Sequence, residues 1–427
     1  MKNACRKMAV MMGCVMLLGA NSARAQDWPQ WRGPNRDAKV TGFEAPKTWP
    51  KELTQQWKVT VGGGDASPAL VGDKLYLFTR QGGDEVTRCL DAATGKEIWQ
   101  DKYEVQPATS PAGGPHAGPR SSPSVADGKV VTLGVRGTLS CLDASTGKKL
   151  WRRDDFRAWP RFFTASSPLI VNGLCIAQLG GPDNGALVAY DLDTGSQKWK
   201  CDCGCPGYAS PVLMDVGGSQ LIVALTDSKI IAARAADGKL VWEAPFPTQR
   251  MAYNASTPIV DGQVLIYGGS GRGEMAVKFD KEADHVAAKK LWTNPQSSVQ
   301  FNSPVLKNGL VIGLTQNNQF FAIDEQTGKT VWSAPAAPAG QTATGGRGER
   351  GGRGGRGSGY GSIVDADTVL LALTPASDLI VIQPDDKKLK EVGRIKVAQT
   401  PTYAYPVVSG NRLFVKDQDT LTLWNVH

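Results

Sequence analysis

A short segment that ends in tryptophan recurs along the chain and restricts the folds that this sequence can adopt. The copies read CLDAATGKEIW, CLDASTGKKLW, AYDLDTGSQKW, AARAADGKLVW, the looser KFDKEADHVAAKKLW, and AIDEQTGKTVW. Each copy follows a small residue and a proline, a short apolar run, a polar turn and an alternating apolar strand. Successive copies lie roughly 40 to 55 residues apart, and a period of that length with four short strands is typical of the blades of a β-propeller.

The recurring residue types of one copy explain how a tight turn forms there. In the first copy, the Asp91 carboxylate can accept hydrogen bonds from backbone N–H groups two residues ahead, and Gly95 can adopt the positive φ that closes a bulged hairpin. Four residues later, Trp99 offers a large rigid face and an indole N–H that needs a partner. Because a blade cannot bury both of its faces alone, we expect the tryptophans at this position to pack between blades. They are Trp57, Trp99, Trp151, Trp199, Trp242, Trp292 and Trp332.

The two ends of the repeat region decide the number of blades. The copy ASDLIVIQPDDKKLKEVGRI keeps the blade pattern but has Ile395 where a tryptophan is expected, and the last copy, YPVVSGNRLFVKDQDTLTLWNV, contains only three strands. The segment ELTQQWKVTV, near residues 52–61, can supply the missing strand and close the ring without a covalent link. The sequence therefore predicts an all-β, eight-bladed propeller of four-stranded antiparallel blades. Seven blades remain the alternative if the copy before Ile395 is not a complete blade.

The N-terminus has the pattern of a secretory signal peptide. Three cations precede an apolar stretch over residues 8–20, and a small-residue cleavage site ends at Ala25. Cys14 lies within the apolar stretch, which makes it a poor lipid-attachment site. The predicted organisation is a signal peptide over 1–25, an N-terminal extension over 26–51 and a propeller over 52–427, with a Gly/Arg-rich loop over 334–360. We expect a protein exported to the periplasm or the extracellular space, with no transmembrane segment.

The net charge of +8 does not indicate a nucleic-acid binder. Residues 1–25 carry four cations and no acid, and the run from Arg347 to Arg356 carries four arginines and one glutamate, so the rest of the chain has a net charge of only +1. A nucleic-acid-binding domain normally shows a basic patch on its folded body. The Gly/Arg-rich loop is interpreted as a surface insertion that is tolerated by the fold, with contact to an anionic surface as the functional alternative.

The repeats resemble the quinoprotein-type (PQQ-like) propeller repeat, whose consensus is Ala-x-Asp-x-x-x-Gly-x-x-x-Trp. The resemblance covers nearly all of residues 52–427, and the segment WPQWRGPNRD, from Trp28 to Asp37, is similar to the mature N-terminus of exported proteins with these repeats. In that family the tryptophan packs between blades and does not touch a cofactor. The resemblance therefore implies a fold and implies little about chemistry.

Two branches of that family lead to different functional predictions. One branch consists of PQQ-dependent alcohol or sugar dehydrogenases, which add a calcium site, a general-base Asp, a tryptophan platform and often a disulfide between adjacent cysteines. The other resembles the outer-membrane protein assembly factors, bare propellers that bind protein partners. This chain has no adjacent Cys-Cys pair, no Cys-x-x-Cys-His motif and no Asp-rich calcium loop. We predict a non-catalytic scaffold for protein partners without a cofactor, and keep the dehydrogenase with PQQ and calcium as the alternative.

The first strand of each blade lines the central channel of a propeller, so the residues just before each strand form a rim. The residues two positions before each start are Asp65, Arg120, Ala165, Tyr208, Ala255, Phe301, Tyr360 and Tyr403, and Asn254 and Asn302 lie beside them in the sequence. These charged and aromatic side chains could hold a small or extended ligand, and a water-filled mouth is the alternative. If a quinone binds, Arg120 is the expected partner of its carboxylate.

The cysteines suggest a metal site only weakly. Cys201, Cys203 and Cys205 alternate, so in an extended segment their thiols face one way, but no nearby His or fourth Cys completes a zinc site. A strained local disulfide or free thiols explain the motif more simply. Cys89 and Cys141 occupy the same position in neighbouring blades, where the distance between them is too long for a disulfide. We therefore expect both to be small core residues.

Overall fold

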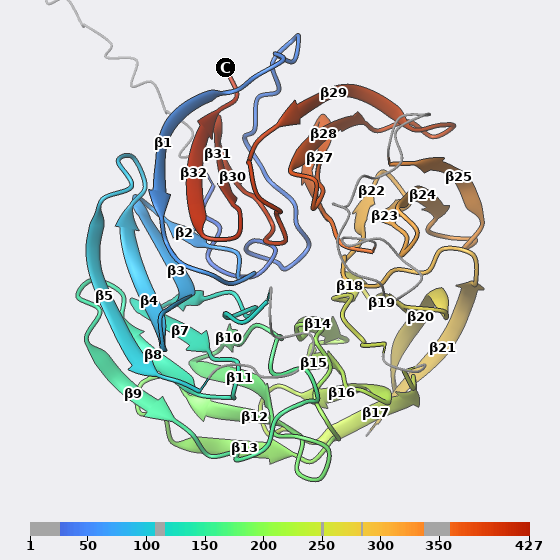
Figure 1. Cartoon of the computed structure of the whole chain (residues 1–427). Helices are drawn as coiled ribbons and strands as arrows, with labels where there is room; N and C mark the ends of the chain where they lie inside the picture. The colour runs from blue at the N-terminus through green and yellow to red at the C-terminus, as the bar shows by residue number, and fades with distance from the viewer. Residues whose placement is uncertain (1–25, 107–115, 249–251, 283–284, 337–358) are drawn as a thin grey trace, which may run out of the picture.

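The computed structural model describes residues 26–106, 116–248, 252–282, 285–336 and 359–427. Its strands form eight four-stranded antiparallel sheets arranged in a ring (Figure 1). The predicted signal peptide over 1–25 lies outside the described residues. So does most of the predicted Gly/Arg-rich loop, including Arg347–Arg356 and the surface contact suggested for it.

Seven blades are built from four consecutive strands each, and every blade runs in chain order from the channel to the periphery. The first three are β2 (Ala69–Val71), β3 (Lys74–Gln81), β4 (Asp84–Asp91), β5 (Glu97–Glu104); β6 (Ser124–Ala126), β7 (Lys129–Leu133), β8 (Leu139–Asp143), β9 (Lys149–Arg153); and β10 (Leu169–Val171), β11 (Leu174–Leu179), β12 (Ala186–Asp191), β13 (Gln197–Cys201). The next two are β14 (Val212–Val216), β15 (Ser219–Leu225), β16 (Lys229–Arg234), β17 (Leu240–Pro245); and β18 (Ile259–Asp261), β19 (Val264–Gly269), β20 (Gly273–Glu282), β21 (His285–Asn294). The sixth and seventh are β22 (Val305–Lys307), β23 (Leu310–Leu314), β24 (Gln319–Asp324), β25 (Thr330–Pro335); and β26 (Ser362–Ala366), β27 (Val369–Leu373), β28 (Asp378–Gln383), β29 (Lys390–Lys396).

The eighth blade joins the two ends of the chain. It contains β30 (Val407–Ser409), β31 (Arg412–Lys416) and β32 (Thr420–Asn425), and its outer strand is β1 (Thr54–Thr60), which pairs antiparallel with β32. Figure 1 shows this closure where the blue strand β1 lies beside the red strand β32. The predicted eight-bladed ring is therefore confirmed, and the copy that lacks a tryptophan forms a complete blade.

The turn between the third and fourth strands forms as its residue types require. The Asp91 carboxylate accepts hydrogen bonds from both the backbone N–H and the hydroxyl of Thr94, at 2.8 and 2.7 Å, and Gly95 has a φ of +71°. Asp143 makes the same turn, where hydrogen bonds from the Ser145 and Thr146 hydroxyls lower the pKa of its carboxyl to about 2. The bonds to the aspartate therefore reach three residues ahead as well as the expected two.

The repeated indoles lie between neighbouring blades, away from the channel. Six of them donate from Nε1 to a backbone carbonyl of the next blade, over 2.7 to 3.2 Å: Trp57 to Ala92, Trp99 to Ala144, Trp151 to Leu192, Trp199 to Ala235, Trp292 to Glu325 and Trp332 to Asp385. The turn glycine of the next blade stands against the indole face. A Cβ added to Gly147 would lie 2.5 Å from the Trp99 ring. The contact of Trp242 differs from these six, because the next blade carries the looser copy of the turn. The Trp242 ring packs edge-on against Phe279, with 4.9 Å between the ring centroids.

The seventh blade corrects one detail of the sequence alignment. In every other complete blade the tryptophan pairs with the third strand just before a β-bulge, and in the seventh blade that register position belongs to Gly393, not to Ile395. A Cβ at Gly393 would lie 3.0 Å from the Cβ of Trp49. Trp49, from the N-terminal extension, thus covers the place that a blade tryptophan occupies elsewhere, while Ile395 is a buried core residue.

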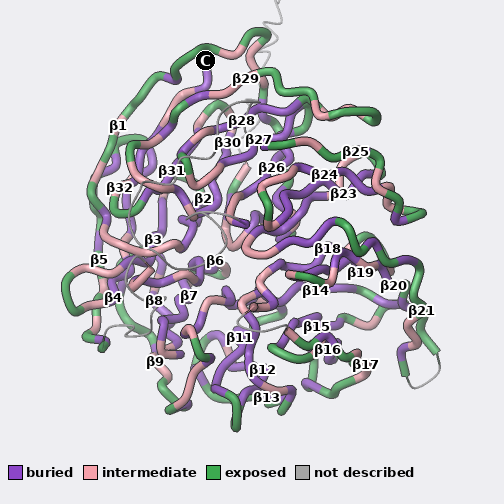
Figure 2. The backbone as a smooth tube through the Cα atoms, turned by 45° about the vertical axis from the view of Figure 1, so that its right-hand side comes forward, coloured by how far each residue is buried: buried purple, intermediate pink, exposed green. Residues whose placement is uncertain are grey.

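The inner strands form the buried core, and the outermost strands are partly exposed (Figure 2). In β27, for example, all five residues are buried, whereas the outer strand β1 has an alternating exposed and half-buried pattern. Within the part of the chain that the structure describes, no helix is both long and apolar enough to cross a membrane.

Candidate functional site at the channel mouth

The blades are linked at the channel by a ring of hydrogen bonds from their starting residues. The backbone N–H of each residue donates to the hydroxyl of the next, over 2.7 to 3.3 Å, in the order Ser67, Ser122, Ser167, Ser210, Thr257, Ser303, Tyr405 and back to Ser67. The Tyr405 hydroxyl reaches across the seventh blade to close the ring. The small hydroxyl residues before each proline are thus explained by contact between blades.

The N-terminal extension enters the channel and forms its floor. Trp28 exchanges both backbone hydrogen bonds with Leu70 at the start of the first blade. Arg32, only 1% exposed, donates to the carbonyls of Ser303 and Pro304 at 2.8 and 2.7 Å. The Trp31 indole N–H donates to the Thr257 hydroxyl at 2.9 Å. The segment therefore binds blade starts on several sides of the ring.

Arg36 continues this contact on the opposite side of the channel. Its guanidinium is 3% exposed and donates to the carbonyls of Ser167, Pro168 and Pro211. Its Nε donates to the Gln30 side chain at 2.9 Å, and burial lowers the pKa of Arg36 to about 9. In the sequence, WPQWRGPNRD stands out only as a family feature, and its two arginines carry no local signal that they fill a channel.

Above this floor the channel opens into a cavity of about 260 Å³. All eight rim residues that the sequence singles out line it: Asp65, Arg120, Ala165, Tyr208, Ala255, Phe301, Tyr360 and Tyr403. The other lining residues are Trp31, His116, Phe162, Ser167, Ser210, Tyr253 and Ser303. The prediction that residues before each first strand form a rim is therefore correct for all eight positions. It does not identify the lining residues that come from the floor and from the loops.

Asn254 and Asn302 do not line the cavity, because both are fully buried in the wall. Asn254 donates from its amide to the carbonyls of Thr226 and Phe246 at 2.7 and 3.0 Å. Asn302 donates to the Leu314 carbonyl at 2.6 Å. Their amides hold loops in place beneath the rim and are not available to a ligand.

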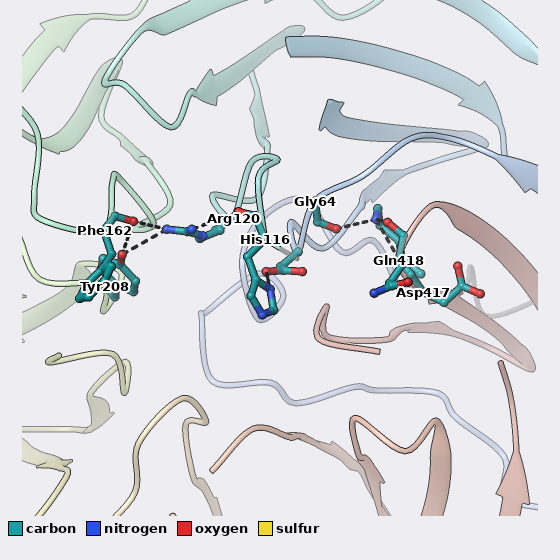
Figure 3. A network of polar contacts seen from close by, with 9 residues as sticks. Gly64, His116, Arg120, Phe162, Tyr208, Asp417 and Gln418 are labelled. Carbon is teal, nitrogen blue, oxygen red and sulfur yellow. Dashed lines mark hydrogen bonds and ion pairs between the residues drawn. The ribbon is translucent and has the colours of Figure 1, made fainter. Parts of the chain in front are cut away.

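The side chains of His116 and Arg120 lie near each other on one part of the rim (Figure 3). The His116 Nδ1 lies 2.7 Å from the Asp65 carboxylate. Arg120 donates to the carbonyls of His116, at 3.0 Å, and Phe162, and to the Tyr208 hydroxyl at 3.1 Å. Among the residues that the structure describes, no carboxylate lies within ion-pair distance of Arg120, so its charge is held by neutral oxygens alone.

A buried lysine fixes the backbone next to Asp65. The Lys416 ammonium donates to the Gly64 carbonyl at 2.5 Å and to those of Asp417 and Gln418 at 3.0 and 3.3 Å. Figure 3 shows Gly64 between His116 on one side and Asp417 and Gln418 on the other. Burial lowers the pKa of Lys416 to about 8.

Aromatic rings form two clusters in the cavity lining. In the first cluster, Tyr208 and Tyr253 stack at 4.7 Å between ring centroids, and Phe162 contacts Tyr253 edge-on. In the second, Phe301 stacks on Tyr360 at 4.4 Å, and Tyr403 meets Tyr360 edge-on. Burial raises the pKa of Tyr208, Tyr253 and Tyr360, so their hydroxyls stay protonated.

None of the described cysteines is among the residues that line this cavity. Cys201, Cys203 and Cys205 are buried free thiols, and the Cys203 thiol is hydrogen-bonded to Cys201, which lowers the pKa of Cys201. Cys89 and Cys141 are fully buried in the core. Within the described ranges, no cluster of three or more His, Cys, Asp or Glu side chains is arranged to bind a metal ion.

The cavity lining does not suit a calcium-bound quinone. Calcium takes six to eight oxygen ligands, several of them carboxylates. Asp65 is the sole carboxylate among the described lining residues, and it is hydrogen-bonded to His116. Arg120 could pair with a carboxylate, but one carboxylate that is already hydrogen-bonded does not supply the several carboxylate ligands of a typical calcium site.

A family model described as outer membrane protein assembly factor BamB matches residues 48–200 and 82–334. The chain belongs to this family of PQQ-like-repeat propellers. The BamB protein of Burkholderia pseudomallei is 26% identical over 298 residues, which cover 66% of this chain and 69% of that protein. The crystal structure of BamB from Moraxella catarrhalis superposes with a TM-score of 0.62 at 17% identity, over 87% of this chain and 97% of that one.

The chain is also similar to a dehydrogenase with the same repeat. The quinohemoprotein alcohol dehydrogenase of Comamonas testosteroni is 27% identical over 191 residues, covering 42% of this chain and 26% of the dehydrogenase. Its crystal structure has a TM-score of 0.68 at 15% identity, over 95% of this chain and 81% of that one. At that identity the superposition shows a common fold and does not distinguish between the two functions.

Proposed function

We propose that this chain is an exported, non-catalytic propeller that binds protein partners in the cell envelope and takes part in outer membrane protein assembly. Its membership in the BamB family and the match to BamB over most of both chains support this function. The lining serines at the channel, Ser167, Ser210 and Ser303, already accept backbone N–H groups of neighbouring blades. They serve as links between blades and not as nucleophiles.

The observation that carries the proposal is a set of exposed apolar side chains on the outer strands. The fourth strand of most blades has a β-bulge, and in five blades its extra residue is aliphatic and 39 to 47% exposed. These residues are Ile98, Leu150, Leu291, Val331 and Val392. A single exposed aliphatic residue needs no explanation, but the same exposed position in five blades gives the periphery a repeated apolar surface for a protein partner.

The test uses the bulge position in different blades. A photo-crosslinking residue at Leu150 or Leu291 should form adducts with proteins of the outer membrane assembly machinery in living cells. The matched control is the bulge residue of the third blade, Lys198, which is polar. The double variant Leu150→Lys/Leu291→Lys should keep the wild-type melting temperature and fail to restore folded outer membrane proteins in depleted cells. Full restoration by this variant would contradict the proposal.

The second candidate is a PQQ-dependent alcohol or sugar dehydrogenase, which the match to the Comamonas enzyme favours. Purified protein incubated with PQQ and calcium should then reduce a dye with alcohols or aldose sugars. We expect no dye reduction, because the described lining has one carboxylate for a calcium ion. Sustained, substrate-dependent dye reduction would overturn the scaffold proposal.

A further inference from the structure

We propose that the channel-mouth cavity binds a sugar acid, a hydroxylated ring that carries a carboxylate, either free or as the end of an acidic polysaccharide. This binding rests on the proposed function in one respect, since a propeller in the cell envelope is exposed to such polysaccharides. It uses the cavity at the channel, whereas the proposed protein contacts use the outer strands. The two can therefore succeed or fail independently.

Arg120 supplies the charge for this ligand. Its guanidinium is fixed over the cavity by the carbonyls of His116 and Phe162 and by the Tyr208 hydroxyl. These oxygens are neutral, and no described carboxylate pairs with it. A cation that is oriented in advance and lacks a counter-ion favours a carboxylate ligand, because charge-assisted hydrogen bonds are stronger than neutral ones.

The aromatic clusters supply flat surfaces for a ring. Two stacked pairs line the cavity, Tyr208 with Tyr253 and Phe301 with Tyr360. The indole of Trp31 belongs to the floor. The volume of about 260 Å³ is slightly below the roughly 300 to 1,000 Å³ of typical ligand pockets. The cavity therefore suits one ring, with any further chain leaving through the mouth.

The remaining polar groups distinguish a sugar acid from a plain aromatic acid. Asp65 and His116 line the same cavity, and their contact uses one carboxylate oxygen and the ring Nδ1, so the other carboxylate oxygen and Nε2 have no partner among the described residues. A site with such groups selects ligands whose hydroxyls can pair with them, because an analogue without hydroxyls leaves the groups unpaired. An aromatic carboxylate would satisfy Arg120 and the ring surfaces but not these groups.

Isothermal titration calorimetry on the purified chain can test this inference with sugar-acid, neutral-sugar and aromatic-acid probes. Glucuronate and galacturonate should bind, glucose should bind at least about tenfold more weakly because it lacks the carboxylate, and benzoate should also bind more weakly because it lacks the hydroxyls. Binding of benzoate as tight as that of glucuronate would replace the sugar acid with an aromatic acid. No binding of either sugar acid would overturn the inference.

Variants separate the site from the general stability of the propeller. Arg120→Gln should weaken glucuronate binding at least about tenfold, whereas Arg272→Gln should not, although Arg272 also donates to two carbonyls, those of Phe246 and Pro247. Ala165→Trp should block binding by filling the cavity while every native hydrogen bond remains. Unchanged binding in Ala165→Trp would show that the sugar acid binds elsewhere. If sugar-acid binding is lost but the crosslinks at Leu150 persist, the inference fails and the proposed function stands.

Discussion

Replacing Arg36 with methionine should destabilise the propeller, because this side chain holds the N-terminal segment inside the channel. The guanidinium donates to the carbonyls of Ser167, Pro168 and Pro211 and to the Gln30 side chain. A hydrogen bond that involves a charged group contributes roughly 1.5 to 3 kcal/mol, so the four bonds together contribute on the order of 8 kcal/mol.

The cost of burying the charge offsets much of this gain. Burial lowers the pKa of Arg36 to about 9, which corresponds to roughly 5 kcal/mol at about 1.4 kcal/mol for each tenfold change in acidity. The difference between the two contributions is about 3 kcal/mol. Arg36→Met should therefore lower the free energy of unfolding by about 2 to 4 kcal/mol.

Urea denaturation followed by tryptophan fluorescence measures this change. The control is Arg157→Met, since Arg157 is an exposed residue with a surface ion pair to Asp154 and should change stability by less than about 0.5 kcal/mol. Because Arg32 and Arg36 anchor one segment, the Arg32→Met/Arg36→Met double variant should lose less than the sum of the single changes. A change within about 0.5 kcal/mol of wild type for Arg36→Met would refute the view that this segment supports the ring.

Two further predictions compare residues of the same type in different blades. Glu274 is fully buried and its Oε1 has no hydrogen-bond partner, so burial raises the pKa of its carboxyl, and the wild-type protein should lose stability as the pH rises above about 4.5. Glu274→Gln should remove that pH dependence and raise the melting temperature at pH 8. Glu85→Gln, also in the third strand of its blade, should lower the melting temperature, because the Glu85 carboxyl accepts bonds from the Tyr103 hydroxyl and the Val135 N–H. Equal effects in thermal melts would contradict this reasoning. Trp99→Phe should lower the free energy of unfolding by about 1 kcal/mol more than Trp242→Phe, because of these two indoles only that of Trp99 donates to a carbonyl of the next blade. Urea denaturation measures both losses, and equal losses would show that this hydrogen bond does not stabilise the contact between blades.

Local residue chemistry explains why so much of the fold could be predicted. The turn of Asp91, Thr94 and Gly95 forms from contacts within a few residues, and the alternating strands on either side repeat the same pattern in each blade. A repeat with one large aromatic per copy can bury its faces only against its neighbours. The copy that lacks a tryptophan shows the limit of this reasoning, because the bulge that places Gly393 at the docking position is visible only in the strand register.

By itself, the sequence determined the blade repeat and the rim positions, because these depend on periodic local patterns and on the order of strands within one blade. It predicted eight blades with seven as the alternative, and the structure has eight. Only the tertiary structure decided what fills and closes the channel. Arg32, Arg36 and Trp49 have their partners in blades that are far away along the chain. Such contacts depend on how the whole ring curves and brings backbone groups from distant parts of the sequence together. No local sequence pattern encodes which of these groups meet.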